Sequence, residues 1–218
     1  MIDKSELKFG LVSQGDFGKF VKLVVNIKDS EAIQYAVYPI FTHLWVYGCW
    51  LRKNLIGVTQ MMPSVISDTA FIIDTTVSQQ YRNKGVGTRL ILERERFLIG
   101  QGRTNVVSTI APWNGPSLNC IITKNSARGV RYHLGNKALG EDKVEIIKDL
   151  TSTKIIGHEA ANMKTFKVHS RKRYLASRQR QDIVELMNAE GYELARVEKL
   201  DKSRNDSCIL FLGLPDGG

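Results

Sequence analysis

A short basic segment that carries two glycines is the part of the chain best suited to bind an anion. It reads Arg82-x-x-Gly85-x-Gly87 and runs directly into a stretch with helical spacing. Glycine takes positive φ readily and has no Cβ to keep a ligand away from the backbone. The first turn of a helix presents N–H groups without intrahelical partners at the positive end of the helix dipole. The segment therefore predicts a phosphate site, although its spacing is neither GxGxxG nor that of a P-loop.

The elements that would position this turn are a strand before it and a helix after it. Residues 70–77 (AFIIDTTV) are rich in Ile, Thr and Val, which favours a strand. Residues 88–102 carry apolar side chains at helical spacing with charged ones between them, and Gly100 and Gly102 are expected to end the helix. We therefore predict a strand–turn–helix unit with positive charge around the turn.

The segment from Asp74 to Gly87 closely resembles the acyl-CoA-binding motif of the GNAT superfamily of N-acetyltransferases. It reads DTTV, SQQ and then YRNKGVG. In that family the turn holds the pyrophosphate of CoA, and the backbone of the preceding strand hydrogen-bonds the pantetheine arm. The resemblance implies that Val77 ends the pantetheine strand. It implies that acetyl-CoA is the cosubstrate and that these residues of the turn and the helix start bind it: Arg82, Lys84, Gly85, Val86, Gly87 and Thr88.

The resemblance covers roughly residues 45–124, so it includes a second segment that could contact the cosubstrate. Residues 106–110 (VVSTI) are expected to form the next strand. Asn114-x-x-Ser117 resembles the Asn-x-x-(Ala/Ser) that opens the following helix of the family. This adds Asn114 and Ser117 to the implied cofactor-binding residues, with Asn114 bonded to the pantetheine. The alternative is that Asn114 is only the N-cap of that helix.

Transfer of an acetyl group to an amine needs a base for the proton of the amine. Asp74 is the expected base, because it is an acid inside an otherwise apolar strand, three residues before Val77, where family members often carry an acid. The alternative is a structural carboxylate that is bonded to neighbouring backbone or to an arginine.

The general acid that returns a proton to the sulfur is not found by counting. Many family members have a tyrosine seven residues after the position of Asn114, and this chain has Ile121 there. Tyr132 and Tyr192 are the alternatives for that role.

Composition describes an ordinary soluble globular protein: 43% of the 218 residues are hydrophobic and 24% are charged. No apolar run approaches the roughly 18 residues of a membrane helix, and the N-terminal residues lack the apolar core of a signal peptide. Three widely spaced cysteines fit a reducing compartment and show no metal-binding spacing. We therefore expect a cytoplasmic protein with no membrane partner and no metal.

The formal net charge of +9 implies attraction to polyanions. The negative charge of CoA accounts for part of it. Much of the rest lies in residues 164–180 (KTFKVHSRKRYLASRQR), which are either a nucleic-acid contact surface or a solvated helix face. A second copy of the chain, forming a homodimer, is a further candidate partner.

The order of the expected elements fits one GNAT-like domain over residues 1–218, an α/β (α+β) mixed sheet of the acyl-CoA N-acyltransferase fold. The N-terminal part is expected to contain a strand over 6–13, helices over 16–27 and 30–39, and a hairpin over 40–62. Residues 125–170 are expected to be an insertion of irregular structure or short strands. Residues 171–218 then close the domain with a helix and two strands, or form a small added αββ extension.

Three functions remain in view. The first is an acetyl-CoA-dependent N-acetyltransferase in which a primary amine of unknown class attacks directly in a ternary complex. The second is an enzyme of the same fold that modifies a DNA or tRNA base, favoured by the basic run. The third is a non-catalytic CoA-binding module, which the missing tyrosine permits.

Overall fold

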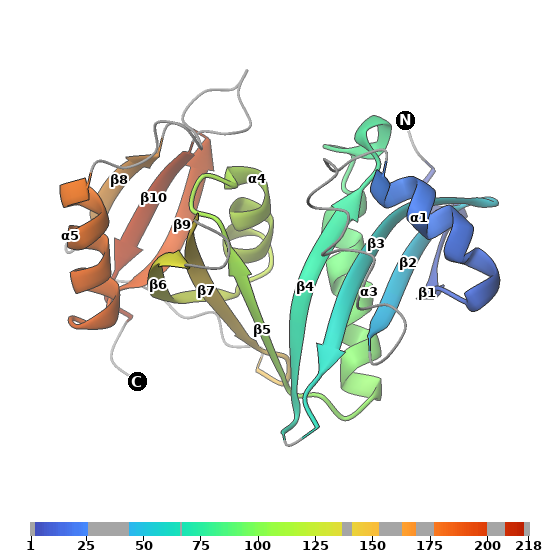
Figure 1. Ribbon diagram of the computed structural model, residues 1–218, viewed down its shortest axis with the longest axis horizontal. Coiled ribbons are helices and arrows are strands. Elements are labelled where there is room, and N and C mark those ends of the chain that lie inside the picture. Colours follow the sequence, from blue (N-terminus) through green and yellow to red (C-terminus); the bar gives the residue numbers. More distant parts are fainter. Residues whose placement is uncertain are drawn as a thin grey trace. The chain divides into compact units, whose positions relative to one another are not determined.

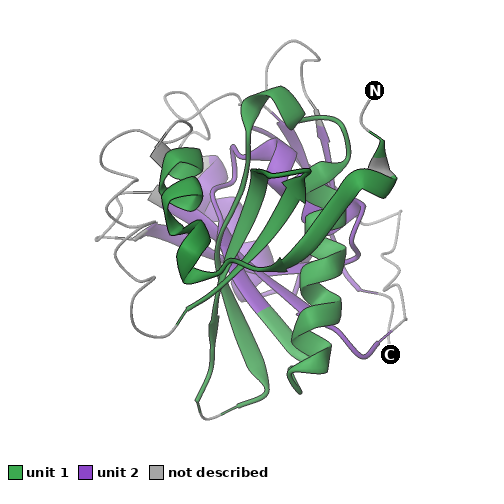
Figure 2. Cartoon of the chain, turned by 90° about the vertical axis from the view of Figure 1, so that its right-hand side faces the viewer, with its two compact units in different colours: residues 1–106 green, residues 107–218 purple. Residues whose placement is uncertain are grey.

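The computed structural model describes residues 3–25, 44–65, 67–136, 141–152, 163–168, 177–199 and 208–215. The chain divides into two compact units, residues 1–106 and residues 107–218 (Figure 2). The second helix expected over residues 30–39 lies outside the described residues.

Unit 1 (residues 1–106) is built on an antiparallel sheet in which neighbours along the chain pair with one another. Its strands lie in the order β1-β2-β3-β4. They are β1 (Leu7–Leu11), β2 (Trp45–Leu51), β3 (Asn54–Pro63) and β4 (Thr69–Val77). The expected first strand, the hairpin and the strand before the basic turn are therefore confirmed.

Helices cover both faces of the unit 1 sheet (Figure 1). On one face, Val58 of β3 packs with Phe20 and Val24 in a buried cluster. On the other face, a Cβ at Gly57 would lie 3.5 Å from Leu90 Cδ2. Neighbouring residues of a strand point to opposite faces, so the two helices lie on opposite sides of β3. The first is α1 (Phe17–Val25), which follows the 3₁₀ turns η1 (Lys4–Glu6) and η2 (Gln14–Asp16), and the second is α3 (Val86–Gly100).

The C-terminal end of α3 is fixed by a glycine in the left-handed conformation. Gly102 has φ of 73°. Its N–H donates to Ile99 O at 2.9 Å, and the Arg103 N–H donates to Leu98 O at 2.9 Å. This pair of bonds is the Schellman motif, which satisfies the last carbonyls of a helix. The expected end of the helix is confirmed.

Unit 2 (residues 107–218) contains strands in the order β7-β6-β9-β10-β8. Its described elements are α4 (Gly115–Leu118), the π-helical turn η5 (Asn119–Thr123), β6 (Arg128–Asn136), β7 (Glu141–Asp149), β8 (Lys164–Val168), α5 (Ser177–Asn188), β9 (Glu193–Lys199) and β10 (Cys208–Gly213). Strand β5 (Asn105–Ile110) begins in unit 1 and ends in unit 2. The expected strand over 106–110 and the closing helix and two strands are confirmed.

Two expectations for unit 2 are wrong in part. The region 125–170 contains β6 and β7, two nine-residue strands that pair as a hairpin, rather than irregular structure or short strands. The basic run 164–180 is not one helix face, because its first five residues form strand β8, which pairs with β10. Phe166 and Val168 are buried while Lys164 and Lys167 are exposed, so the apolar–polar alternation of a strand is present there.

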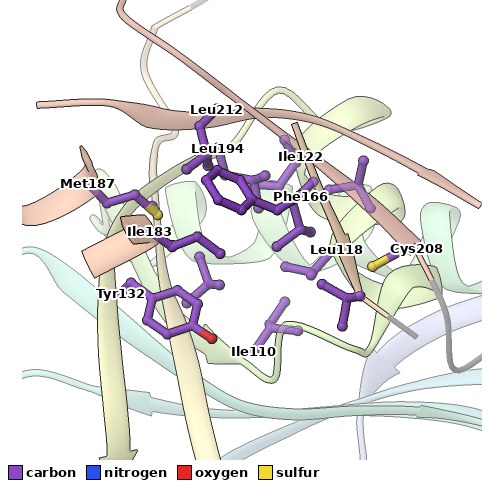
Figure 3. Packing of buried hydrophobic residues seen from close by; sticks show 14 of the residues in the cluster. Ile110, Leu118, Ile122, Tyr132, Phe166, Ile183, Met187, Leu194, Cys208 and Leu212 are labelled. Carbon is purple, nitrogen blue, oxygen red and sulfur yellow. The ribbon is translucent and has the colours of Figure 1, made fainter. Parts of the chain in front are cut away.

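The core of unit 2 is a cluster of apolar side chains from α4, α5 and the strands, as Figure 3 shows. Ile183 and Met187 of α5 lie beside Tyr132 of β6 in that cluster. β6 and β9 approach closely at Gly129, where a Cβ would lie 2.6 Å from the Cβ of Leu194. Only glycine fits there without displacing β9.

The described residues contain neither a membrane-spanning helix nor a metal-binding cluster. Among the described residues, no helix combines the length and the apolar character that a bilayer crossing requires. Within the same ranges, no group of three or more His, Cys, Asp and Glu side chains is placed to hold a metal ion.

Candidate functional site

Strand β4 carries a β-bulge beside the acid that the sequence singles out. Gln60 of β3 pairs with Asp74, and the next residue, Met61, pairs with Ile72, so Ile73 is an extra residue in β4. A bulge bends its strand and re-aims the side chains next to it, and bulges are frequent near active sites. The direction of Asp74 is therefore set by this irregularity as well as by the strand.

Asp74 lies half-buried on the α1 face of the sheet. Gln60, its partner in β3, is two residues from Val58, and side chains two apart in a strand share a face. The Asp74 Oδ2 accepts a hydrogen bond from Thr76 Oγ1 at 2.6 Å. Its backbone carbonyl accepts a hydrogen bond from Thr59 Oγ1 at 3.1 Å. The carboxylate is thus oriented by a buried threonine on its own strand.

The turn between β4 and α3 contains two residues in the left-handed region. After the short 3₁₀ turn η4 (Gln79–Tyr81), Asn83 has φ of 59° and Gly85 has φ of 81°. Asparagine tolerates this conformation better than most residues, and glycine adopts it freely. No heavy atom lies within 4 Å of a Cβ placed on Gly85. The turn is thus open on the side where a side chain would stand.

Helix α3 begins directly after Gly85, with its first turn anchored by a buried valine. Val86 is buried, and the Arg89 N–H donates to Gly85 O at 3.1 Å as the first bond of the helical ladder. The N–H groups of Val86 and Gly87 precede that bond, in the first turn, where a helix leaves its backbone donors without intrahelical partners. Thr88 completes the same turn. A helix start of this kind is where proteins commonly bind anions.

Basic side chains surround this helix start. Arg82 is exposed, and its Nε donates to Val77 O at 3.0 Å, which ties the guanidinium to the end of β4. Lys84 is exposed, and its Nζ lies 6.0 Å from the centre of the Tyr81 ring. Arg89 of the first turn is 4.0 Å from Glu93. The turn therefore presents positive charge next to backbone donors, as a diphosphate requires.

The backbone of Val77 points to the edge of β4 that faces away from β3. The Ser78 N–H donates to Ile56 O of β3 at 2.9 Å. Successive residues of a strand direct their backbone groups to alternate sides, so the Val77 groups point the other way, where its carbonyl meets Arg82. The end of β4 therefore offers backbone groups on that edge.

Most of the predicted site residues lie together in unit 1. A single continuous segment from the middle of β4 to the first turn of α3 holds Asp74, Val77, Arg82, Lys84, Gly85, Val86, Gly87 and Thr88. Asn114 and Ser117 lie in unit 2, where Asn114 is the N-cap of α4 and its Oδ1 accepts from the Ser117 N–H at 3.3 Å. The cap alternative for Asn114 is therefore realised in the structure.

The candidates for the general acid are engaged in the core of unit 2. Tyr132 is buried, and its hydroxyl donates to Asp142 Oδ2 at 2.8 Å. Tyr132 and Tyr192 are both buried in the apolar cluster of unit 2, and Ile121 packs against that cluster. The Tyr132 hydroxyl is therefore already bonded to a buried carboxylate, and the acid role stays a prediction for the two tyrosines.

Gln60 is a residue of this region that the sequence interpretation passed over. It is fully buried on β3, opposite Asp74. Its signal in the sequence is a polar residue within the apolar run of residues 55–62, LIGVTQMM. A polar residue in such a run is unusual, because buried polar groups need hydrogen-bond partners.

Comparison with known proteins finds a family match and a shared fold. Residues 27–121 match the Acetyltransferase (GNAT) family. Among curated protein sequences, none matches this chain.

Three solved structures illustrate the shared fold. The ribosomal-protein-S18-alanine N-acetyltransferase from Escherichia coli has a TM-score of 0.57 at 9% identity, covering 68% of this chain and 96% of that one. A chimeric spermidine N-acetyltransferase from Vibrio cholerae has a TM-score of 0.55 at 13% identity, covering 67% and 96%. An acetyltransferase from Bacillus subtilis in complex with CoA has a TM-score of 0.51 at 16% identity, covering 66% and 98%. At such low identities the likeness shows that the fold is shared.

Proposed function

We propose that this chain transfers the acetyl group of acetyl-CoA to a primary amine, as an enzyme of the Acetyltransferase (GNAT) family, which residues 27–121 match. The observation that carries the proposal is the helix start at Gly85. There a left-handed glycine, the first-turn N–H groups and exposed cations converge directly after the strand that bears Asp74. The CoA-bound acetyltransferase from Bacillus subtilis has the same fold, which supports CoA as the ligand.

The residues of unit 1 fit the diphosphate of acetyl-CoA. The N–H groups at Val86 and Gly87 would donate to its oxygens, and Arg82 and Lys84 would neutralise its charge. The absence of a side chain at Gly85 lets the backbone approach the phosphates. The outward backbone edge of β4 at Val77 would bond the pantetheine arm. When bound, acetyl-CoA supplies an acetyl thioester, from which the acetyl group passes to the amine nitrogen as the carbon–sulfur bond breaks.

Asp74 is the proposed base for the proton of the acceptor amine. Its carboxylate is held in orientation by Thr76 at 2.6 Å on the face of β4 that α1 covers. A positioned carboxylate of this kind can accept the proton as the carbon–nitrogen bond forms. The proton that the sulfur needs is assigned to no residue here.

A primary amine is the proposed acceptor class. Two acetyltransferases of the same fold are named for a ribosomal-protein alanine and for spermidine. Direct attack in a ternary complex requires only that the amine reach the thioester beside Asp74, and no covalent enzyme intermediate is needed.

The first experiment is thermal unfolding with and without acetyl-CoA. Ligand at about 100 times its Kd stabilises a protein by about 2.7 kcal/mol, which raises the Tm of a chain of this size by roughly 5–10 °C. Gly87→Glu should abolish the rise, because it places a carboxylate against the phosphates. The helix itself tolerates an acid in its first turn, and a Cβ at Gly87 makes only an ordinary contact of 3.7 Å with Val77.

Gly100→Glu is the matched control, since it adds the same charge at the other end of α3 and should keep the ligand-induced rise. Activity is then measured as free thiol released from acetyl-CoA with three amines: spermidine, an alanine-terminated peptide and a lysine-containing peptide. A wild-type Tm that does not respond to millimolar acetyl-CoA would contradict the proposal.

A further inference from the structure

Gln60 is a buried polar side chain that neither the packing of the core nor the proposed phosphate turn (residues 82–87) explains. Its exposed fraction is 0%. Neither its Nε2 nor its Oε1 has a hydrogen-bond partner among the described residues. Burying an amide without partners lowers stability, and an apolar side chain of the same size would avoid that loss. A reason other than packing is therefore needed for a glutamine in the middle of β3.

The position of Gln60 points to Asp74. The two residues pair directly across β3 and β4, on the face that α1 covers. Residues paired in this way have Cβ atoms roughly 4.5–5.5 Å apart, so a glutamine side chain can reach the carboxylate. The bulge at Ile73 begins immediately after this pair and fixes its register. The unpartnered amide thus stands beside the proposed base.

The hydrogen bond from Thr76 does not exhaust the acceptor capacity of the Asp74 carboxylate. It occupies Oδ2 of Asp74 from within β4, at 2.6 Å. An ionised carboxylate has two oxygens, each of which can accept more than one hydrogen bond. A donor on β3 would approach it from the neighbouring strand, and two donors on different strands fix its orientation better than one.

We propose that Gln60 is a positioning residue for Asp74, an inference that rests on the proposed function. Its Nε2 donates to the Asp74 carboxylate when the acceptor amine binds. The carboxylate is then held between β3 and β4 in the orientation that takes the proton of the amine. Gln60 itself does not touch the reacting atoms and acts only through Asp74.

The first test is a double-mutant comparison of acetyl transfer. Gln60→Met keeps the size of the side chain and removes both polar atoms. Thiol release with the fastest of the three amines should fall about tenfold, the loss expected for one hydrogen bond that matters in the transition state. In an Asp74→Asn background the same change should cause no further loss. An equal loss in both backgrounds would mean that Gln60 acts on the fold, and it would overturn the proposal.

The second test is thermal unfolding without ligand, which needs no acceptor. Gln60→Met should melt at the same temperature as the wild type or above it, because two unpartnered polar atoms leave the core. Met61→Leu, at the adjacent buried position on the other face, is the control for a small change in packing. A clear fall in Tm for Gln60→Met beyond that of the control would show that the amide already makes a structural hydrogen bond, and it would contradict the inference.

The acetyl-CoA-induced rise in Tm separates this inference from the proposed function. Gln60 is not part of the phosphate turn, so Gln60→Met should keep the full rise. If the wild type shows no rise, the proposed function fails. If the rise is intact and Gln60→Met turns over at the wild-type rate, only the role of Gln60 fails.

Discussion

At the scale of single residues, the two ends of helix α3 carry glycines whose backbones differ. Gly85 has φ of 81°, a conformation that costs other residues about 1–2 kcal/mol. Gly100 lies in the last turn of α3 with a Cβ position open to solvent. The first glycine is therefore required by its conformation, whereas the second is an ordinary helical position.

We predict opposite effects of alanine at these two positions. Gly85→Ala should lower the free energy of unfolding by about 1–2 kcal/mol and should weaken acetyl-CoA binding. Gly100→Ala should raise it by about 0.5–1 kcal/mol, because alanine is the better helix former. Urea unfolding monitored by circular dichroism measures both. If Gly85→Ala instead raised the free energy of unfolding and Gly100→Ala lowered it, α3 would not start at Gly85.

The residues that sequence alone could predict are those whose signals are local. The glycines at 85 and 102, the Ile- and Thr-rich run of β4 and the position of Asp74 within it all follow from neighbouring letters. The role of Gln60 does not follow from its neighbours in the sequence, because it depends on which residue of β4 pairs with Gln60. Nothing in the sequence marks the extra residue Ile73 that places Gln60 opposite Asp74.

At the scale of elements, α5 is fastened to the β6–β7 hairpin by a buried ion pair. Asp142 of β7 is fully buried, and Arg180 of α5 contacts its two oxygens at 2.6 and 2.8 Å. The Tyr132 hydroxyl and the Gly135 N–H each donate to it at 2.8 Å. Burial raises the pKa of Asp142, but the hydrogen bonds from Arg180, Gly135 and Tyr132 outweigh burial and hold the pKa below its ordinary value.

This ion pair also shows why the sequence could not predict the contact between α5 and the β6–β7 hairpin. Asp142 and Arg180 are 38 residues apart, and the long segment between them gives no hint that they meet. The interpretation of residues 125–170 as irregular or short strands failed for a related reason. Strand β7 (EDKVEIIKD) contains many charged residues, so its alternation is difficult to recognise, although Val144 and Ile146 face the core.

We predict that removing Arg180 destabilises unit 2 strongly. Arg180→Met leaves the Asp142 carboxylate buried without its charge partner and should lower the free energy of unfolding by about 2–4 kcal/mol, a little under the range for fully buried pairs since Arg180 is partly exposed. Arg96→Ala, which breaks an exposed pair with Glu93, should cost less than about 1 kcal/mol. Chemical denaturation of the two variants makes the comparison, and similar losses would contradict the structural role of Asp142.

The hydrogen bonds to Asp142 predict that the protein loses stability as the pH falls. The pKa of Asp142 is lower in the folded state than the unfolded value of about 3.9. The contribution of the ionised carboxylate to the free energy of unfolding is therefore fully present above about pH 4. It is lost as the pH falls through the folded pKa. Asp142→Asn should therefore be less stable than the wild type at pH 7, and the difference should shrink at pH 3. A difference that is constant with pH would show that the carboxylate is not ionised in the fold.

At the scale of the whole molecule, the net charge of +9 is the property that bears most on possible polyanionic partners. The basic run 164–180 is divided between strand β8 and α5 with residues 169–176 outside the described ranges. Lys164 and Lys167 are exposed on β8, which ends the strand order of unit 2. Lysines on an edge strand also prevent pairing with other chains, so their presence there has a structural reason.

We predict that binding to duplex DNA depends on the total charge rather than on this run. Lys164→Glu with Lys167→Glu should weaken gel retardation of a random duplex as much as Lys8→Glu with Lys22→Glu does, since both pairs are exposed and change the charge equally. A much larger loss for the first pair, with steep salt dependence, would favour the alternative in which residues 164–180 contact nucleic acid.

The central claim is that the helix start at Gly85 binds the diphosphate of a thioester carrier, and calorimetry can test it with two ligands. Acetyl-CoA has the diphosphate and acetyl-pantetheine lacks it. The account predicts that the wild type binds acetyl-CoA about 100-fold more tightly than acetyl-pantetheine, which corresponds to about 2.7 kcal/mol. It also predicts that Gly87→Glu removes this difference while Gly100→Glu preserves it. Equal affinity of the wild type for the two ligands, or a difference that survives Gly87→Glu, would contradict the claim.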